Sequence, residues 1–422
     1  MRDPLPQATP FLRLGGREWH LPTALRAFSH RNYRLYWFGQ LISLTGTWMQ
    51  STAQQWLVYR LTGSPLALGT VMFLNALPAM LLSLFAGIVV DRVDKRRFLL
   101  LTQTALMTPA FILAALTFTG VVQYWHILVL AVCLGLANTF DMPARQAFTV
   151  EMVGKDDLMN AIALNSSMFN GARLIGPAAA GLLVAQVGEA TAFLLNGLSF
   201  LAVIGGLALM RLPAFTPRPG RLTPLADLRE GLGYIRRNRA VLALVSVAAV
   251  PSVFGFPATT LLPAVARDVL GLGVDGYGGL VSAIGLGALV GALSLATLGD
   301  YRPKGRLLTT ATFVFAGALI GAALARSAWL AGAALVLAGW GMVTHLAATI
   351  SLVQLQVPDI LRWRVMSAYL WAVVGLAPAG SLALGTLAEW WGAPGALLAG
   401  GAVCLLSALT MLAAFPQVRA LE

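Results

Sequence analysis

The chain has 422 residues, of which 58% are hydrophobic and 11% are charged, and its mean hydropathy is +0.76. A water-soluble domain is about 45–50% apolar and about 25% charged, so this composition excludes a soluble multidomain protein and predicts that lipid surrounds much of the chain. The net charge of +12 suits either a nucleic-acid binder or a protein with one face toward anionic lipid, and the positions of the charges decide between these.

The first 34 residues carry six arginines and no apolar core, so we expect a polar N-terminal segment and not a signal peptide. Twelve apolar runs follow, and about 20 residues suffice for one membrane-spanning helix. The sequence therefore predicts an all-α membrane protein with twelve transmembrane helices, and eleven or thirteen are the alternative counts. These runs lie near 35–59, 66–90, 98–119, 124–144, 160–186, 190–210, 241–265, 276–299, 307–325, 328–352, 366–388 and 393–415.

The basic residues indicate how the spans are oriented. If the N-terminus is cytoplasmic, only Arg60, Arg267 and Arg326 of the 29 Lys and Arg residues fall outside, and Arg173 lies within a span. Such an excess on one side follows the positive-inside rule and predicts that both termini are cytoplasmic. Because the charges are spread over one membrane face, we expect a lipid bilayer as a partner and no nucleic acid.

The longest polar loop divides the spans into six and six. Within it, Leu225, Leu228, Leu232 and Ile235 recur at helical spacing, which favours an amphipathic helix on the cytoplasmic surface over an irregular tether. The predicted domains are a cytoplasmic N-terminal segment 1–33, a six-helix bundle 34–211, the central loop 212–239, a second six-helix bundle 240–415 and a cytoplasmic tail 416–422.

The two halves contain a repeated charged motif. The cytoplasmic ends of the second and eighth spans carry the same three charges, at a constant offset of 209 residues. These are Asp91, Lys95 and Arg97 in the first half and Asp300, Lys304 and Arg306 in the second. Two related six-helix bundles joined by a basic loop are typical of a transporter that rocks around a central site.

These motifs resemble those of the major facilitator superfamily, whose loop motif matches Gly87-x-x-x-Asp91-Arg92-x-x-Lys95-Arg96-Arg97. Asp141-Met-Pro-Ala-Arg145-Gln146 and a late stretch through Arg362-Trp363-Arg364 are similar to the enterobactin-exporter-like branch, also called transmembrane secretion effectors, although Trp363 stands where that branch usually has Gly. Gly176-Pro177-x-x-x-Gly181 resembles the fifth-helix motif of antiporters. The resemblance implies two pseudo-symmetric six-helix bundles and export of a small molecule.

The resemblance also implies a cytoplasmic gate. Asp91 would accept hydrogen bonds from the free amides that begin the eleventh span, near Met366 and Ser367, and Lys95 or Arg92 would pair with Asp141. The alternative is that these charges only fix the topology. Spacing lets Asp141 and Arg145 pair on one helical face. The gating residues we expect are Asp91, Arg92, Lys95, Arg97, Asp141, Arg145, Asp300, Lys304 and Arg306.

One face of the first span is polar. Its side chains Gln40, Ser43, Thr47, Gln50 and Gln54 are spaced by three and four residues and therefore line one helical face. Neutral polar side chains avoid lipid, so they predict either a hydrated substrate cavity or a hydrogen-bonded seam between helices. Asn75 in the second span is expected to face the same space.

Arg173 is the most costly residue to place in lipid, at about 2.5–3.5 kcal/mol on insertion scales. Since no acidic residue lies at mid-depth of a span, we expect Arg173, with Asn170, to face the cavity; a structural arginine bonded to polar groups is the alternative. His345 is a further cavity candidate that titrates near neutral pH, although a buried His often only donates a hydrogen bond between helices.

Small residues and prolines predict close packing and bends. Gly176, Pro177 and Gly181 belong to a small-residue surface on the fifth span. Prolines at 251, 257 and 378 predict bends in the seventh and eleventh spans.

Functional motifs of enzymes are missing from the sequence. Both cysteines lie in apolar runs, and the sequence has no nucleotide-binding loop, paired-histidine metal motif or nucleophile elbow. We expect no enzyme activity, cofactor or metal.

The sequence predicts a secondary transporter of the bacterial cytoplasmic (inner) membrane. It would export a small amphiphilic molecule, such as a siderophore, drug or metabolite, by alternating access with proton antiport, as a monomer. Uptake, lipid flipping and a non-transporting receptor or scaffold are the alternatives. Uniport and coupling through the charge of the substrate are the alternatives to proton antiport. Candidates for the titrating group are Asp91, Asp141, Asp268 and His345.

Overall fold

The computed structural model describes residues 11–14, 17–20, 22–211, 224–298 and 303–415. A short antiparallel hairpin of β1 (Phe11–Leu14) and β2 (Arg17–His20) and a turn of helix η1 (Thr23–Ser29) precede the long helices. The first six long helices are α1 (Arg31–Thr62), α2 (Pro65–Arg92), α3 (Lys95–Phe118), α4 (Tyr124–Val153), α5 (Leu158–Val187) and α6 (Glu189–Ala208).

The later helices follow the gap at 212–223. They are α7 (Pro224–Arg237), α8 (Arg239–Val250), α10 (Val274–Leu298), α11 (Lys304–Leu324), α12 (Ala328–Gln356), α13 (Asp359–Leu370) and α14 (Ala377–Ala414). Short segments η2 (Pro251–Gly255), η3 (Phe256–Leu261), α9 (Leu262–Ala264) and η4 (Val265–Val269) continue α8, and η5 (Trp371–Gly375) joins α13 to α14.

Ten helical segments of the described residues are long and apolar enough to cross a membrane. The helix α1 is not among them, because glutamines and hydroxyl side chains interrupt its apolar run. The segment 359–414 counts once, although Gly392 breaks it with φ 71° and ψ 164°. The structure thus bears out a multi-span helical membrane protein, and the number of spans depends on how α1 and α14 are counted.

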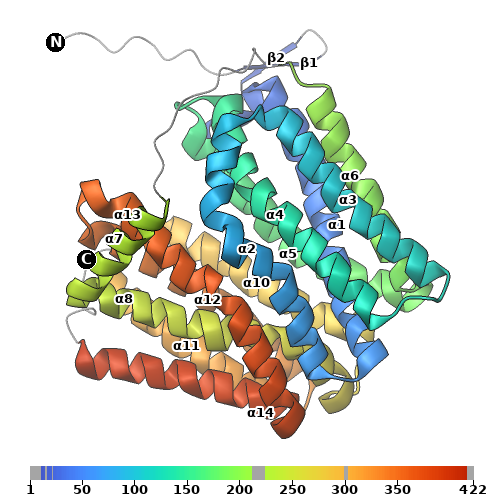
Figure 1. The fold of residues 1–422 in the computed structure, drawn as a ribbon, viewed down its shortest axis with the longest axis vertical. Helices are drawn as coiled ribbons and strands as arrows, with labels where there is room; N and C mark the ends of the chain where they lie inside the picture. The colour runs from blue at the N-terminus through green and yellow to red at the C-terminus, as the bar shows by residue number, and fades with distance from the viewer. Residues whose placement is uncertain (1–10, 15–16, 21, 212–223, 299–302, 416–422) are drawn as a thin grey trace.

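The helices α1–α6 pack against one another, and the later helices do the same (Figure 1). Between these two groups, α5 packs along α10 and α2 packs along α14. Close approach requires glycine: a Cβ on Gly69 would lie 2.4 Å from the Ser381 carbonyl oxygen, and one on Gly385 would lie 3.0 Å from that of Pro65.

The bends predicted from proline coincide with departures from regular α-helix. A π-helical turn, η2, begins at Pro251, and the 3₁₀ turn η3 contains Pro257. Another π-helical turn, η5, ends just before Pro378. Proline has no N–H to donate and clashes with the preceding turn, which favours a departure from regular α-helix at these positions.

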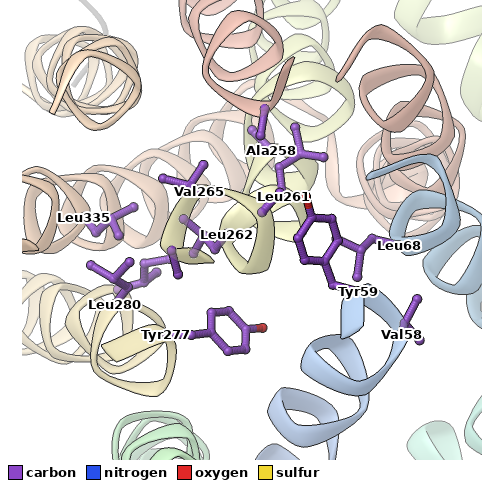
Figure 2. Packing of buried hydrophobic residues seen from close by; sticks show 14 of the residues in the cluster. Val58, Tyr59, Leu68, Ala258, Leu261, Leu262, Val265, Tyr277, Leu280 and Leu335 are labelled. Atoms are coloured by element: carbon purple, nitrogen blue, oxygen red, sulfur yellow. The ribbon is translucent and has the colours of Figure 1, made fainter. Parts of the chain in front are cut away.

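The largest apolar cluster joins both groups of helices at one end of the molecule. Figure 2 shows Tyr59 of α1 and Leu68 of α2 beside Leu261 and Leu262, with the ring of Tyr277 from α10 close by. We call this the closed end: α1 ends there, and α2, α6 and α10 begin there. The helices α7 and α13, by contrast, lie apart from α3 and α6 (Figure 1).

Candidate substrate cavity and gates

A cavity of about 590 Å³ lies among α1–α6, and every residue that lines it belongs to these helices. Its wall combines amides and hydroxyls with aromatic rings and thioethers. The polar side chains are Gln40, Thr47, Gln50, Ser51, Gln54, Gln55, Asn75, Asn138, Gln146, Thr149, Asn165 and Asn196. The aromatic and thioether side chains are Tyr36, Trp48, Phe169, Phe200, Met72, Met142 and Met168.

The polar face of α1 supplies much of this wall. Four of the five residues in the stripe line the cavity, and Ser43 is buried outside the lining. The amide of Asn196 on α6 donates to Gln50 Oε1 at 2.7 Å and so fixes that side chain. Gln40 is only 1% exposed, and neither of its amide atoms has a partner within the described residues. The stripe is therefore partly a cavity wall and partly a seam to α6.

Asn75 on α2 also lines the cavity, and its amide donates to the Ala131 carbonyl of α4 at 3.2 Å. The backbones of α2 and α4 come close here, since a Cβ on Gly135 would overlap the Asn75 carbonyl oxygen at 1.8 Å. A single residue thus links the cavity wall to the packing of two helices.

The cavity contains one ion pair, between Asp141 and Arg145 one turn apart on α4. The Asp141 side chain is 1% exposed and also accepts from Thr102 Oγ1 at 2.6 Å and Gln103 Nε2 at 2.7 Å, both on α3. A buried carboxylate needs such donors to offset the loss of water. All of these partners belong to α3 and α4, so the cluster joins two neighbouring helices.

The loop motif lies between the end of α2 and the start of α3. Asp91, Arg92 and Arg97 are exposed, and the carboxylate of Asp91 makes no hydrogen bond or ion pair to another described residue. Lys95 Nζ contacts Glu151 Oε1 on α4 at 2.7 Å, and Asp141 has Arg145 as its cation. The structure therefore does not bring Lys95 and Asp141 together as a pair.

The second copy of the motif is described only in part. Asp300 lies outside the described residues, Lys304 is half-buried at the start of α11, and Arg306 is exposed two residues further on.

Three cavity candidates lie outside the lining. Arg173 on α5 is half-buried, with its guanidinium 5.6 Å from the ring centre of Trp48 and Nη2 3.7 Å from Met342 Sδ. Asn170 donates to the Ser166 carbonyl within its own helix at 2.9 Å. His345 is buried on α12, where Nδ1 lies 2.8 Å from Thr312 Oγ1.

The small residues of α5 lie at two helix contacts. A Cβ on Gly176 would lie 2.5 Å from Trp48 Cβ on α1, and one on Gly181 would lie 3.0 Å from the Asp275 backbone on α10. The Pro177 carbonyl approaches Gly278 of α10 equally closely, at 2.5 Å from a Cβ built there. Larger side chains would push these helices apart.

Several lining residues are absent from the predictions made from sequence. Trp48 and Phe169 have their rings 5.8 Å apart on α1 and α5, and Met168 lies beside them in the lining. Their signal in the sequence is weak, because an aromatic or Met in an apolar span is equally suited to lipid or to helix packing.

Known proteins match this chain along most of its length. A family model described as "Transmembrane secretion effector" matches residues 22–422. The chain belongs to this family, a branch of the major facilitator superfamily. The multidrug efflux pump Tap of Mycolicibacterium fortuitum is 28% identical over 402 residues, which cover 91% of this chain and 96% of that protein.

Two further relatives are shorter matches. The staphyloferrin A transporter of Staphylococcus aureus is 25% identical over 68% of this chain and 72% of its own length. The macrolide efflux protein A of Streptococcus pyogenes is 24% identical over 66% of this chain and 69% of its own.

Solved structures support the fold. A peptide transporter of the POT family superposes with a TM-score of 0.75 at 13% identity, covering 94% of this chain and 96% of that one. A bacterial homologue of the human lysosomal transporter Spinster superposes with a TM-score of 0.69 at 14% identity, covering 93% of this chain and 96% of that one. The chain is therefore a multi-span membrane transporter of the major facilitator superfamily, and not an enzyme.

Proposed function

We propose that the chain exports small amphiphilic molecules from bacterial cells by alternating access and proton antiport. It would act as a monomer in the cytoplasmic membrane, with twelve spans in two six-helix bundles and both termini cytoplasmic. In this count α1 is a polar span, and Gly392 separates the last two spans. The relatives named above for siderophore, macrolide and multidrug transport support export.

The observation that carries the proposal is the composition of the cavity wall. Amides on α1, α2 and α4–α6 offer both donors and acceptors, while Trp48 and Phe169, with nearby thioethers, offer flat and polarisable apolar surface. A molecule with an apolar body and scattered polar groups satisfies both. Asp141 and Arg145 neutralise each other in the wall, so the cavity does not require a substrate that carries a net charge.

The proposed conformation is inward-facing. Hydrogen bonds and apolar packing join the two groups of helices at the closed end, which the orientation of the spans assigns to the outside. Asp91, at the other end, is exposed, as expected when the cytoplasmic gate is open. The expectation that free amides lie near Met366 and Ser367 is wrong, because both residues lie inside α13, which begins at Asp359. In the outward-facing state Asp91 would instead bind the amides of the first turn of α13, and the cytoplasmic gate would close.

Coupling to protons rests on Asp141 and on the resemblance of Gly176-Pro177 to the antiporter motif. Asp141 is the carboxylate of the cavity wall and is reached from the substrate space. We propose that it takes up a proton in the outward-facing state and releases it to the cytoplasm before substrate binds.

We retain Arg173, Asn170 and His345 as proposed parts of the transport path, in positions that the inward-facing cavity does not reach. The Arg173 guanidinium contacts the ring of Trp48 and the thioether of Met342, and it pairs with no carboxylate of the described residues. A shift of α5 against α1 would expose its charge to a substrate. If Arg173→Ala leaves substrate affinity and flux unchanged in reconstituted vesicles, Arg173 has no place in this path.

The decisive experiment is flux into inverted vesicles of a compound panel, with and without an imposed acidic interior. Proton antiport predicts accumulation that depends on the gradient and collapses when a protonophore is added. Flux that ignores the gradient would refute antiport, and binding without flux would refute transport in favour of a receptor. Vesicles without the protein serve as the control.

A further inference from the structure

Polar contacts cross between the two groups of helices at the closed end. The hydroxyl of Tyr59, in the last turn of α1, donates to Asp268 Oδ2 in η4. The Arg267 guanidinium lies 5.9 Å from the centre of the same tyrosine ring. Tyr59 is buried and Asp268 is exposed, so the contact forms at the rim of the apolar cluster.

A second contact lies at the start of α2. Glu389, three residues before the break at Gly392 in α14, accepts from the hydroxyl of Ser64 and from the Leu66 amide at 3.1 Å. Ser64 is the N-cap of α2 and already accepts from the Ala67 amide. The first amides of a helix have no partner within it, and the helix dipole favours a negative charge there.

This second contact is the counterpart of the loop motif at the opposite end of the same helices. In the loop motif, Asp91 at the end of α2 is expected at the start of the eleventh span. At the closed end, Glu389, near the end of that span, binds the start of α2. The backbones of α2 and α14 are already in contact one turn further in, at Gly69 and Gly385.

We propose that the Tyr59–Asp268 and Ser64–Glu389 contacts form the gate that holds the closed end shut while the cytoplasmic end is open. This inference rests on the proposed alternating access, since a gate is needed only if that end opens. Every donor comes from α1 or α2 and their link, and every carboxylate comes from the second group of helices. Opening the end therefore breaks both contacts together and leaves the two exposed carboxylates with water as their partner.

The alternative is a static brace, and a matched control separates the two. At the same end, Arg60 Nε contacts Glu189 Oε1 of α6 at 2.8 Å. That pair joins two helices of one group, so it stays intact when the groups separate. Glu189→Gln removes a carboxylate from the same end and leaves the gate in place.

The experiment measures the distance across the closed end by spin labels in the purified full chain in nanodiscs. Labels at Val121, after α3, and Arg326, after α11, lie on the two groups and are both exposed. The exposed Cys133 and buried Cys404 are first replaced by Ser and Ala, to leave the labels unique.

Tyr59→Phe combined with Glu389→Gln is expected to raise the ratio of long to short distances by roughly tenfold, because the Tyr59–Asp268 hydrogen bond is lost and the two bonds accepted by residue 389 lose their charge, in one state only. Glu189→Gln is expected to leave the ratio within about twofold of the parent. Equal ratios in the double variant and the control would overturn the gate. The measurement uses no substrate, so a shift in distances without flux of any compound would instead refute the proposed export.

Discussion

The buried carboxylate of Asp141 gives the sharpest test of how the cavity is built. Asp141→Asn keeps the shape of the side chain but removes the negative charge to which Arg145, Thr102 and Gln103 all donate. The new amide group donates, and it faces groups that also donate. The Arg145 side chain, 21% exposed, then has no carboxylate within this cluster.

The size of the effect follows from burial. Removing one partner of a buried ion pair costs about 3–5 kcal/mol, and the residual exposure of Arg145 places the expected loss near the lower end, at about 3 kcal/mol. Arg145→Gln in the same background is expected to recover part of this loss, since no unpaired charge then remains.

The assay is the free energy of unfolding in mixed micelles, measured for both single variants and the double variant. Glu151→Gln is the control, because it makes the same chemical change on α4, at a side chain that is 42% exposed and pairs with Lys95. We expect less than about 1 kcal/mol from it. An equal loss from Asp141→Asn and Glu151→Gln would refute the reasoning that the Asp141 cluster is a buried joint between α3 and α4.

Three further predictions follow from the gate, the wall and the helix contacts. Asp91→Asn should cut flux at least tenfold while the amount of protein in the membrane fraction is unchanged, because the outward-facing state loses its charged contact; parental flux would remove Asp91 from the gate. Trp48→Ala should raise the substrate concentration for half-maximal flux by roughly tenfold through lost ring contact, whereas Trp329→Ala, at a side chain 90% exposed on α12, should not. Gly176→Ala should lower the midpoint of thermal unfolding because its Cβ meets α1 at 2.5 Å, while Gly171→Ala, with open space around it, should leave the midpoint unchanged or raise it.

Composition and spacing predict the class of the molecule because membrane spans obey simple rules of length and polarity. The same rules miss a span whose functional side chains are polar, because those side chains lower its hydropathy. The polar face by which α1 lines the cavity also lowers its hydropathy below that of the other spans. The break at Gly392 is a positive-φ position between two apolar runs, which a window of hydropathy does not register.

The rotation of each helix about its axis is the part that sequence does not specify. Spacing places Arg173 and Gly176 on the same side of α5, one turn apart. The contact of Gly176 with Trp48 turns that side toward α1, so Arg173 lies behind Trp48 and outside the cavity wall. The same spacing argument works for the stripe on α1, because the amide of Asn196 and the open cavity both lie on its polar side.

The few charges of the chain divide according to which helices they join, and this division bears on how transport is powered. The pairs Asp141–Arg145, Lys95–Glu151 and Arg60–Glu189 each lie within the first group of helices. If the groups rock as rigid bodies, these ion pairs stay intact throughout the cycle and do not respond to the change of conformation. Proton coupling through Asp141 therefore requires α3 and α4 to shift relative to each other, so that its donors separate when the carboxylate is protonated. If the first group of helices is rigid in both conformations, Asp141 cannot couple protons to the cycle. The groups able to do so would then be the carboxylates at the ends of α2 and α14, which exchange partners.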